Sequence, residues 1–358
     1  MIRRFGLADC TRSRARAPMW RAACLVLPLA IVLSGCAGFF SSPPPPTPAP
    51  LVDPPRRAGR PLVLIAMPDS ASFHTVRRTL IDEVKSDFDV ETEIIKAGTT
   101  PIQLRDRLQS SGAAAVVLMD NPTIKLYRAC QAAVPPGQPP VPAAVVVMAS
   151  FLEEASARLP NVSGVAYEVP AVTALVNLRA IIDRPIRRVG VVHRPVFQRF
   201  LARQTELAAR EQIELVPVAV SAHPSAEEIR AALRQLRRSA QIDALWVLND
   251  NQLLRNAAFL AAAWRPELAA MDVPVIVGTP ALVGHEAQFG TFAVVPDLDA
   301  LGVQAANLVF EVAENGWKAS GISVEPPIST VTIGNMRQLR QRFGLREDGA
   351  TRIDRRID

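Results

Sequence analysis

The chain has 358 residues, enough for about two domains that each bury a hydrophobic core. Its hydrophobic fraction of 49% and charged fraction of 21% exclude a disordered chain, and its four cysteines are too few for a disulfide scaffold. Forty lysines and arginines against 34 acidic residues give a net charge of +6. This surplus favours an anionic partner only if it lies on the folded part of the protein.

The positive charge is concentrated at the amino terminus. Six arginines lie within the first 21 residues, and an apolar run from Ala22 to Leu33 follows them. This pattern predicts a secretory signal peptide, because the apolar run is shorter than the roughly 20 residues that span a bilayer. The run ends in Leu33-Ser34-Gly35-Cys36, which resembles a bacterial lipobox, so we expect cleavage after residue 35 and lipid on Cys36. Either Met1 or Met19 fits as the start of this signal.

Removal of residues 1–35 changes the meaning of the composition. Six arginines and one aspartate leave with this segment, so the net charge falls from +6 to +1 and no nucleic-acid partner is expected. Cys130 remains as a lone thiol, for which a buried, unreactive position is favoured. Ala37 follows the lipidated cysteine, and by resemblance to bacterial lipoproteins this implies sorting to the outer membrane, with the protein facing the periplasm.

Residues 36–60 are rich in proline and include four consecutive prolines. Such a segment favours extended polyproline II, which packs no core. We therefore expect a tether that holds the folded part away from the membrane. Binding to a proline-recognition module is the less ordinary alternative.

From Pro61 onward, short aliphatic runs alternate with amphipathic stretches. Apolar runs of this length indicate strands that are covered on both faces, as in parallel sheets. The predicted strands are 62–67, 113–119, 143–148, 189–192, 215–220, 244–248 and 273–277. The predicted helices include 73–86, 197–210 and 225–239, the last with a capping serine at its start and arginines at its end. Two such series, 61–165 and 186–290, predict α/β architecture with two Rossmann-like lobes.

Motifs for catalysis or cofactor binding are absent from the sequence. The strand-to-helix turns carry no GxGxxG, no P-loop and no GxSxG. The four histidines are far apart, and the acidic residues form no obvious catalytic pair. We therefore expect no enzyme, no cofactor and no metal site, and a binding module becomes the leading interpretation.

Three segments carry a resemblance to a known family. NVSGV at 161–165, RRVGVV at 187–192 and DALWVLNDN at 243–251 resemble the ABC transporter substrate-binding protein family, which has the type I periplasmic-binding fold. The resemblance runs from about Pro61 to Leu345 and implies two α/β lobes with parallel sheets, joined by a hinge. It also implies capture of a small molecule between the lobes, and some members bind aromatic amino acids.

The resemblance and the chain order together suggest domain boundaries. Residues 61–165 plus about 292–325 are expected to form lobe 1, and residues 166–291 plus about 326–345 lobe 2. The charged tail, 346–358, is expected to fray.

Ligands of open parallel sheets lie beyond the carboxyl ends of the strands. The candidate ligand contacts are therefore polar residues after predicted strands, together with Tyr167 near the crossover between the lobes. Those after the strands are Ser70, Ser72, Asp120, Asn121, Ser150, His193, Asn249, Asp250, Asn251 and Thr279. Each of Ser70, Asp120, Asn249 and Thr279 could equally cap a helix. Asp250 could accept a ligand ammonium, Tyr167 could stack on a ligand or pack on the crossover, and Trp246 is expected in the core.

Two functions remain open. The first is a lipid-anchored solute-binding protein that captures a small molecule, amino-acid-like by resemblance, for uptake through an ABC permease. The second is an outer-membrane lipoprotein that reuses the fold as an envelope interaction, assembly or sensor subunit. An adjacent permease gene would favour the first, and adjacent envelope genes the second.

Overall fold

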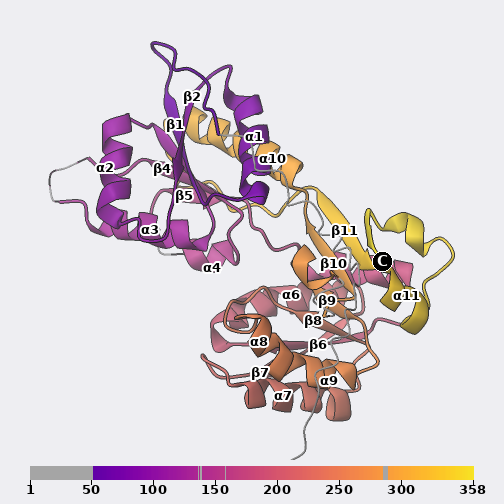
Figure 1. The fold of residues 1–358 in the computed structure, drawn as a ribbon. Coiled ribbons are helices and arrows are strands. Elements are labelled where there is room, and N and C mark those ends of the chain that lie inside the picture. The colour runs from indigo at the N-terminus through magenta and orange to yellow at the C-terminus, as the bar shows by residue number, and fades with distance from the viewer. Residues whose placement is uncertain (1–50, 136, 138, 158, 285–288) are drawn as a thin grey trace, which may run out of the picture. The chain divides into compact units, whose positions relative to one another are not determined.

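The structure is a computed structural model that describes residues 51–358 except for 136, 138, 158 and 285–288. The predicted signal peptide, Cys36 and the first part of the proline-rich segment lie outside the described residues. From Ala49 onward the chain forms one compact unit, and this unit contains two sheets, each with helices on both faces (Figure 1). We call each sheet with its covering helices a lobe.

The sheet of lobe 1 has five parallel strands in the order β2-β1-β3-β4-β5. Helices α1 and α10 cover one face, and α2 and α3 cover the other (Figure 1). The elements are β1 (Leu62–Met67), α1 (Ala71–Val84), β2 (Asp89–Ile94), α2 (Pro101–Ser111), β3 (Ala115–Met119), α3 (Asn121–Ala132), β4 (Ala143–Val147), α4 (Leu152–Ser156), β5 (Val162–Gly164) and α10 (Leu298–Glu314).

Strand β1 shows why an uninterrupted apolar run predicts a central strand. Its side chains alternate between the two faces, so Val63 and Ile65 pack under α1 and α10 while Leu64 and Ala66 pack under α2 and α3. Neither set is exposed to water, and all six residues of the strand are buried. A strand covered on both faces needs apolar residues at every position.

The sheet of lobe 2 has seven strands in the order β12-β11-β10-β9-β8-β6-β7. Strands β6 to β10 are parallel, as expected, and β11 runs antiparallel to β10 near the edge of the sheet. Helices α5, α6 and α11 cover one face and α7 and α9 the other. The strands are β6 (Arg188–His193), β7 (Glu214–Ala219), β8 (Ala244–Val247), β9 (Val275–Val277), β10 (Phe292–Pro296), β11 (Thr330–Asn335) and β12 (Arg355–Ile357). The helices are α5 (Ala171–Ile181), η1 (Pro195–Phe197), α6 (Gln198–Arg210), α7 (Ala226–Gln235), η2 (Leu236–Ala240), α8 (Ala257–Phe259), η3 (Leu260–Trp264), α9 (Arg265–Ala269), η4 (Pro280–Leu282), α11 (Met336–Arg342) and η5 (Gly349–Arg352).

The chain passes between the lobes in three places within the described residues. It leaves lobe 1 after β5, returns between β10 and α10, and leaves again between α10 and β11. Two of these crossings lie beside each other, because Ala166 N donates to Glu325 O at 2.8 Å and Glu325 N donates to Gly164 O at 3.0 Å. Residues 165–170 therefore form part of the hinge.

One of the predicted domain boundaries needs correction. Residues 292–296 were expected in lobe 1, but β10 is the third strand of the lobe 2 sheet, between β9 and β11. The chain returns to lobe 1 with α10 and the residues that follow it to about 325. There Gly302 lets α10 approach α1 so closely that a Cβ at this position would lie 2.7 Å from Val76 O. The crossing therefore falls at Pro296 rather than near residue 291.

The carboxyl-terminal tail, expected to fray, is ordered into the lobe 2 sheet. Strand β12 pairs with β11, and Ile353 is buried in the core. Thr332 N donates to Asp354 Oδ2 at 2.8 Å, and these hydrogen bonds hold the pKa of Asp354 below its usual range. The mixed charges of residues 346–358 concealed this strand, because an edge strand needs few apolar residues.

The end of the predicted tether also contacts the folded part. Asp53 accepts hydrogen bonds from the nearly buried Arg77, at 2.5 Å, and from Thr92 N on edge strand β2, at 2.8 Å. Arg57 N donates to both carboxylate oxygens of Asp89 at 3.0 Å. Among the described residues the tether therefore ends before Asp53 rather than at residue 60.

Candidate functional site

The carboxyl ends of β3 and β4 hold three residues in an unusual backbone conformation. Asp120 has φ 90°, Met148 has φ 57° and Phe151 has φ 54°, all in a region that side chains other than glycine rarely adopt. Backbone strain of this kind is often found in loops that hold binding or catalytic groups in place. Two of these residues, Asp120 and Phe151, lie directly beside predicted site residues.

Two predicted residues of lobe 1 bind each other. Asn121 donates its side-chain amide to Ser150 O, and Ser150 N donates to Asn121 Oδ1, both at 2.7 Å. Asp120 caps α3 by accepting from Thr123 N at 2.8 Å, and its burial raises the pKa of its carboxyl. The two hydrogen bonds between Asn121 and Ser150 hold the loop after β3 against the loop after β4. Ser70 and Ser72 are exposed, and Ser70 makes no side-chain capping bond.

The predicted residues of lobe 2 are mostly engaged with the protein itself. Asp250 is 2% exposed, and its carboxylate accepts hydrogen bonds from Arg194 Nε at 2.5 Å and Arg194 Nη2 at 2.8 Å. It also accepts a hydrogen bond from Gln252 N at 2.8 Å. His193 is buried with Nδ1 3.1 Å from Arg194 O, Asn251 is exposed, and Thr279 precedes η4 without a side-chain cap. Because both oxygens of Asp250 accept from Arg194, this aspartate is placed to orient that arginine.

A narrow pocket of about 30 Å³ lies at the carboxyl ends of β8 and β9 and reaches the hinge. We call it the inter-lobe pocket; its principal lining residues are Phe151, Tyr167, Glu168, Phe200, Trp246 and Asn249. Phe151 meets Phe200 edge-on with ring centroids 5.0 Å apart, and Phe200 lies 6.0 Å from Trp246. The structure thus brings Tyr167 and Asn249 together, and Trp246, predicted to be in the core, lines the pocket from its buried position.

Asn249 has one satisfied and one unsatisfied amide atom. Its Nδ2 donates to Gly278 O at 3.1 Å, which fixes the orientation of the amide. Its Oδ1 is buried and has no hydrogen-bond partner among the residues that the structure describes. Gly278 is needed for this arrangement, because a Cβ there would lie 2.4 Å from Asn249 Nδ2.

Glu168 is the functional residue that sequence reasoning missed. Its Oε2 accepts from Phe151 N at 2.7 Å, whereas its Oε1 is buried and has no partner among the described residues. Burial raises the pKa of Glu168 to about 7, and the hydrogen bond from Phe151 N offsets this effect only in part. A glutamate in a connecting segment is usually solvated, and nothing in the sequence signals that the hinge buries this one.

A second pocket of about 240 Å³ adjoins the first. We call it the acidic pocket, since four carboxylates line it beside Arg203: Glu153, Glu154, Glu168 and Glu325. Arg203 of α6 pairs with Glu153 at 2.8 Å and Glu154 at 2.7 Å, which ties lobe 2 to α4 of lobe 1. Glu168, Phe151 and Phe200 line both pockets.

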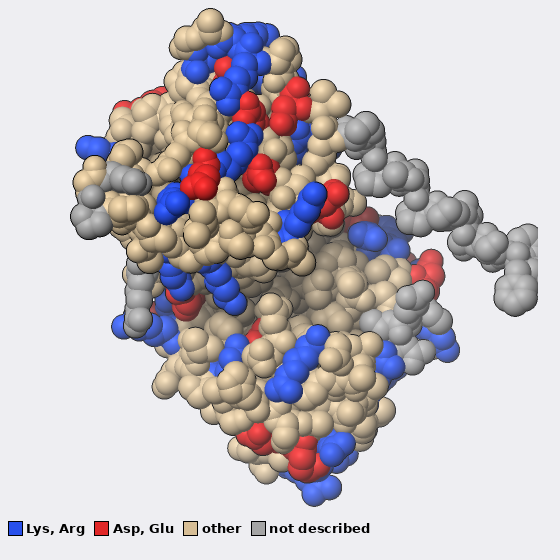
Figure 2. Space-filling model, turned by 60° about the vertical axis from the view of Figure 1, so that its left-hand side comes forward, with Lys and Arg blue, Asp and Glu red and all other residues tan. Residues whose placement is uncertain are grey.

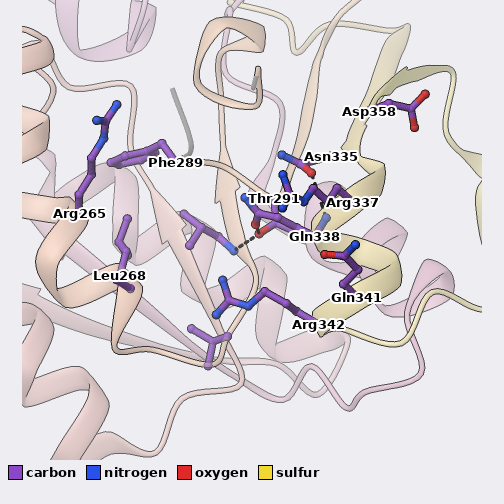
Figure 3. A pocket seen from close by; sticks show the side chains of 13 residues that line it. Arg265, Leu268, Phe289, Thr291, Asn335, Arg337, Gln338, Gln341, Arg342 and Asp358 are labelled. Carbon is purple, nitrogen blue, oxygen red and sulfur yellow. Dashed lines mark hydrogen bonds between the residues drawn. The ribbon is translucent and has the colours of Figure 1, made fainter. Parts of the chain in front are cut away.

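A third pocket of about 410 Å³ lies elsewhere in lobe 2 (Figure 3). It is formed at the amino ends of β9 and β10, where Thr291 donates to Gln338 Oε1 at 2.7 Å, and Arg337 and Arg342 come from α11 (Figure 3). Ligands of parallel sheets lie at the carboxyl ends. This pocket is therefore at the opposite end of the sheet from the predicted contacts.

The described residues give no indication of a metal site, a reactive thiol or a membrane-spanning helix. No group of three or more His, Cys, Asp or Glu side chains there could hold a metal ion. The thiol of Cys130 is buried, and burial raises its pKa to about 11, as an unreactive thiol requires. No helix in the described ranges has the length and apolar character that a membrane span needs. Figure 2 shows acidic and basic side chains interspersed on the visible face.

Comparison with solved structures identifies the fold as that of type I periplasmic-binding proteins. A substrate-binding protein with adhesive properties from Clostridium difficile, in a ligand-free open structure, matches with TM-score 0.59 and 15% identity over 84% of this chain and 99% of that one. An ABC domain from Streptococcus pneumonia in complex with L-Trp matches with TM-score 0.53 and 15% identity, over 83% and 100% of the two chains. A conserved domain protein from Vibrio cholerae matches with TM-score 0.54 and 18% identity, over 83% and 99%.

Sequence comparison adds no closer relative: no protein-family model matches the chain, and no curated protein matches it. At these identities the likeness of the solved structures establishes the fold. The expectation of two α/β lobes of this class is confirmed.

Proposed function

We propose that this chain is a lipid-anchored periplasmic solute-binding protein that captures a small molecule between its lobes. The observation that carries the proposal is the inter-lobe pocket, which combines aromatic side chains with two buried acceptor atoms that have no hydrogen-bond partner in the described part of the chain. Buried polar atoms are nearly always hydrogen-bonded, so two orphans in one pocket are typical of a ligand site.

The type of solute and the route of delivery belong to this proposal. Fold relatives include a protein bound to L-Trp, which supports an organic solute with an aromatic part as one candidate class. Delivery to an ABC permease would follow from hinge closure around the solute. The lipid on Cys36 would hold the protein at the membrane, with the segment from Ala37 to Val52 as its spacer.

The alternative is an outer-membrane lipoprotein that uses the fold for envelope assembly or sensing. Ala37 after the lipidated cysteine favours the outer membrane, from which an inner-membrane permease is hard to reach. In that case the pocket would hold a regulatory solute or none.

Thermal-shift screening of the full chain tests the proposal. We expect at least one solute among amino acids, aromatic acids, amines, purines and sugars to raise the melting temperature at about 1 mM, because a ligand that binds only the folded state stabilises it. No stabilisation by any solute would contradict the solute-binding function and favour the alternative.

A further inference from the structure

The chemistry of the pockets identifies the class of solute, and this step rests on the proposed function. Both orphan atoms of the inter-lobe pocket are acceptors: Glu168 Oε1 from the hinge and Asn249 Oδ1 from the loop after β8. They need hydrogen-bond donors from outside the protein. Opposite the ionised form of Glu168 an anionic group would bring only further acceptors and a like charge, so a carboxylate or phosphate does not fit between them.

The charges around Glu168 point to the same conclusion. Besides Glu168 itself, the acidic pocket carries Glu153, Glu154 and Glu325 against the single cation Arg203. Arg203 already pairs with Glu153 and Glu154, while Glu325 accepts only from the neutral amide of Gln304 at 2.8 Å. The remaining ionisable neighbour is Tyr167, and burial raises the pKa of its phenol, so it stays neutral at pH 7. Among the described residues no cation therefore pairs with the carboxyl groups of Glu168 and Glu325.

The two pockets differ in size, which suits a solute with a small polar head group and a larger apolar part. The inter-lobe pocket of about 30 Å³ has room for a group the size of a water molecule or an ammonium. The acidic pocket of about 240 Å³ adjoins it through Glu168, Phe151 and Phe200 and can hold a ring or a short chain. Aromatic faces at Tyr167, Phe200 and Trp246 add attraction for a cation placed among them.

We propose that the solute is a primary amine in its protonated form, whose ammonium donates to Glu168 Oε1 and Asn249 Oδ1 in the inter-lobe pocket. Its apolar part lies along Phe151 and Phe200 and extends into the acidic pocket. A primary ammonium has three N–H donors and so satisfies both acceptors at once, whereas a quaternary ammonium has none. Asp250, the predicted ammonium acceptor, does not take this role because Arg194 occupies both of its oxygens.

Isothermal titration of the full chain with three ligands of one shape tests the assignment. The ligands are phenethylamine, phenethyl alcohol and 3-phenylpropionate, which share a ring and chain and differ in the charge of the head group. We expect phenethylamine to bind at least about 10-fold more tightly than the alcohol, since a hydrogen bond to a charged group contributes about 1.5–3 kcal/mol. The propionate is expected not to bind. Equal affinity for amine and alcohol, or tighter binding of the propionate, would overturn the assignment.

A pair of variants places the amine at Glu168. Glu168→Gln keeps the shape of the side chain and removes its charge, so we expect phenethylamine affinity to fall about 10-fold to 100-fold. Glu206→Gln removes an exposed acid from the solvent side of α6 and should leave the affinity unchanged. Unchanged affinity in Glu168→Gln would overturn the role of Glu168. The three-ligand series on the unaltered chain decides the charge preference even if this variant fails to fold.

The same experiments separate this inference from the function on which it rests. If amino acids, sugars, purines or aromatic acids stabilise the chain and amines do not, the solute-binding function stands and the amine assignment is wrong. If no solute of any class binds, both are wrong.

Discussion

At the scale of single residues, the position of Glu168 in the inter-lobe pocket could not be predicted from the sequence. Asn249 was predicted as a contact because it follows a strand, and Tyr167 because it lies near the crossover; both line the inter-lobe pocket. Glu168 adjoins Tyr167 but could not be singled out, because its burial depends on the hinge and on Phe151 from a distant loop. Asp250 follows a strand as expected, yet its pairing with Arg194 depends on a residue 56 positions away.

The raised pKa of Glu168 predicts a pH-dependent stability. Below about pH 4.5 the carboxyl is protonated in both folded and unfolded chains, so it costs nothing. Between about 4.5 and 7 the unfolded chain loses this proton first, so the free energy of unfolding decreases as the pH rises, by about 3 kcal/mol in total. We therefore expect Glu168→Gln to melt several degrees above the unaltered chain at pH 8 and close to it at pH 4.5. Equal melting temperatures at pH 8 would show that Glu168 is not desolvated.

The same pKa predicts how amine binding depends on pH. Ammonium binding needs an ionised Glu168, so the affinity for phenethylamine should decrease as the pH falls below about 7, approaching tenfold per unit. Titration calorimetry between pH 5.5 and 8.5, a range that brackets the pKa of Glu168, measures this slope. In Glu168→Gln the slope should disappear, and a slope that persists would have another origin.

Gly278 offers a test of the Asn249 side of the pocket. In Gly278→Ala the new Cβ would lie 2.4 Å from Asn249 Nδ2, so the amide must move and its hydrogen bond to Gly278 O is lost. We expect solute affinity to fall at least about 10-fold and the free energy of unfolding to decrease by about 1–3 kcal/mol. Gly284→Ala is the matched control, because the nearest atom to its Cβ lies at an ordinary 3.6 Å. Denaturant unfolding and titration calorimetry on both variants measure these effects.

At the scale of elements, the apolar strands could be predicted and the polar edge strands could not. The predicted runs 62–67 and 244–248 correspond to β1 and β8 because central strands are apolar at every position. Strands β2, with sequence DVETEI, and β12, with sequence RRI, are edge strands. An edge strand can carry polar residues, so no apolar run in the sequence predicts either of them. The same reason explains why the tail was expected to fray.

The contact of Asp53 with edge strand β2 predicts a measurable contribution to stability. Asp53→Ala leaves the guanidinium of Arg77, which is 5% exposed, without its carboxylate and frees Thr92 N. We expect the free energy of unfolding to decrease by about 2–4 kcal/mol, as when one partner of a buried pair is removed. Asp87→Ala, at an exposed position before β2, should change it by less than about 0.5 kcal/mol. Denaturant unfolding curves of both variants measure the difference, and equal curves would show that the segment is not docked.

At the scale of the whole molecule, the sequence predicts both the charge balance of the folded part and its two-lobed architecture. Five of the six units of net positive charge belong to residues 1–35, so the folded part is close to neutral and carries mixed charges on the face seen in Figure 2. The two-lobed fold could be predicted because its strands repeat in order along the sequence. The crossing at Pro296 was misplaced because β10 is as apolar as any strand of either lobe.

The membrane anchor is a prediction about the intact protein. Cys36→Ser removes the thiol that would carry lipid, so we expect the variant to leave the membrane fraction and appear in the soluble envelope fraction. Cell fractionation with immunoblotting measures this, and Cys130→Ser, which alters a buried thiol, is the control that should remain in the membrane fraction. A Cys36→Ser protein that stays with the membrane would contradict lipid anchoring at this residue.

Hydrogen–deuterium exchange with and without the best-stabilising solute shows whether the solute is captured between the lobes. We expect slower exchange in three segments that line the inter-lobe pocket: 148–154, 165–170 and 246–250. Protection confined to the segments around Thr291 and Gln338, which line the pocket of Figure 3, would contradict it.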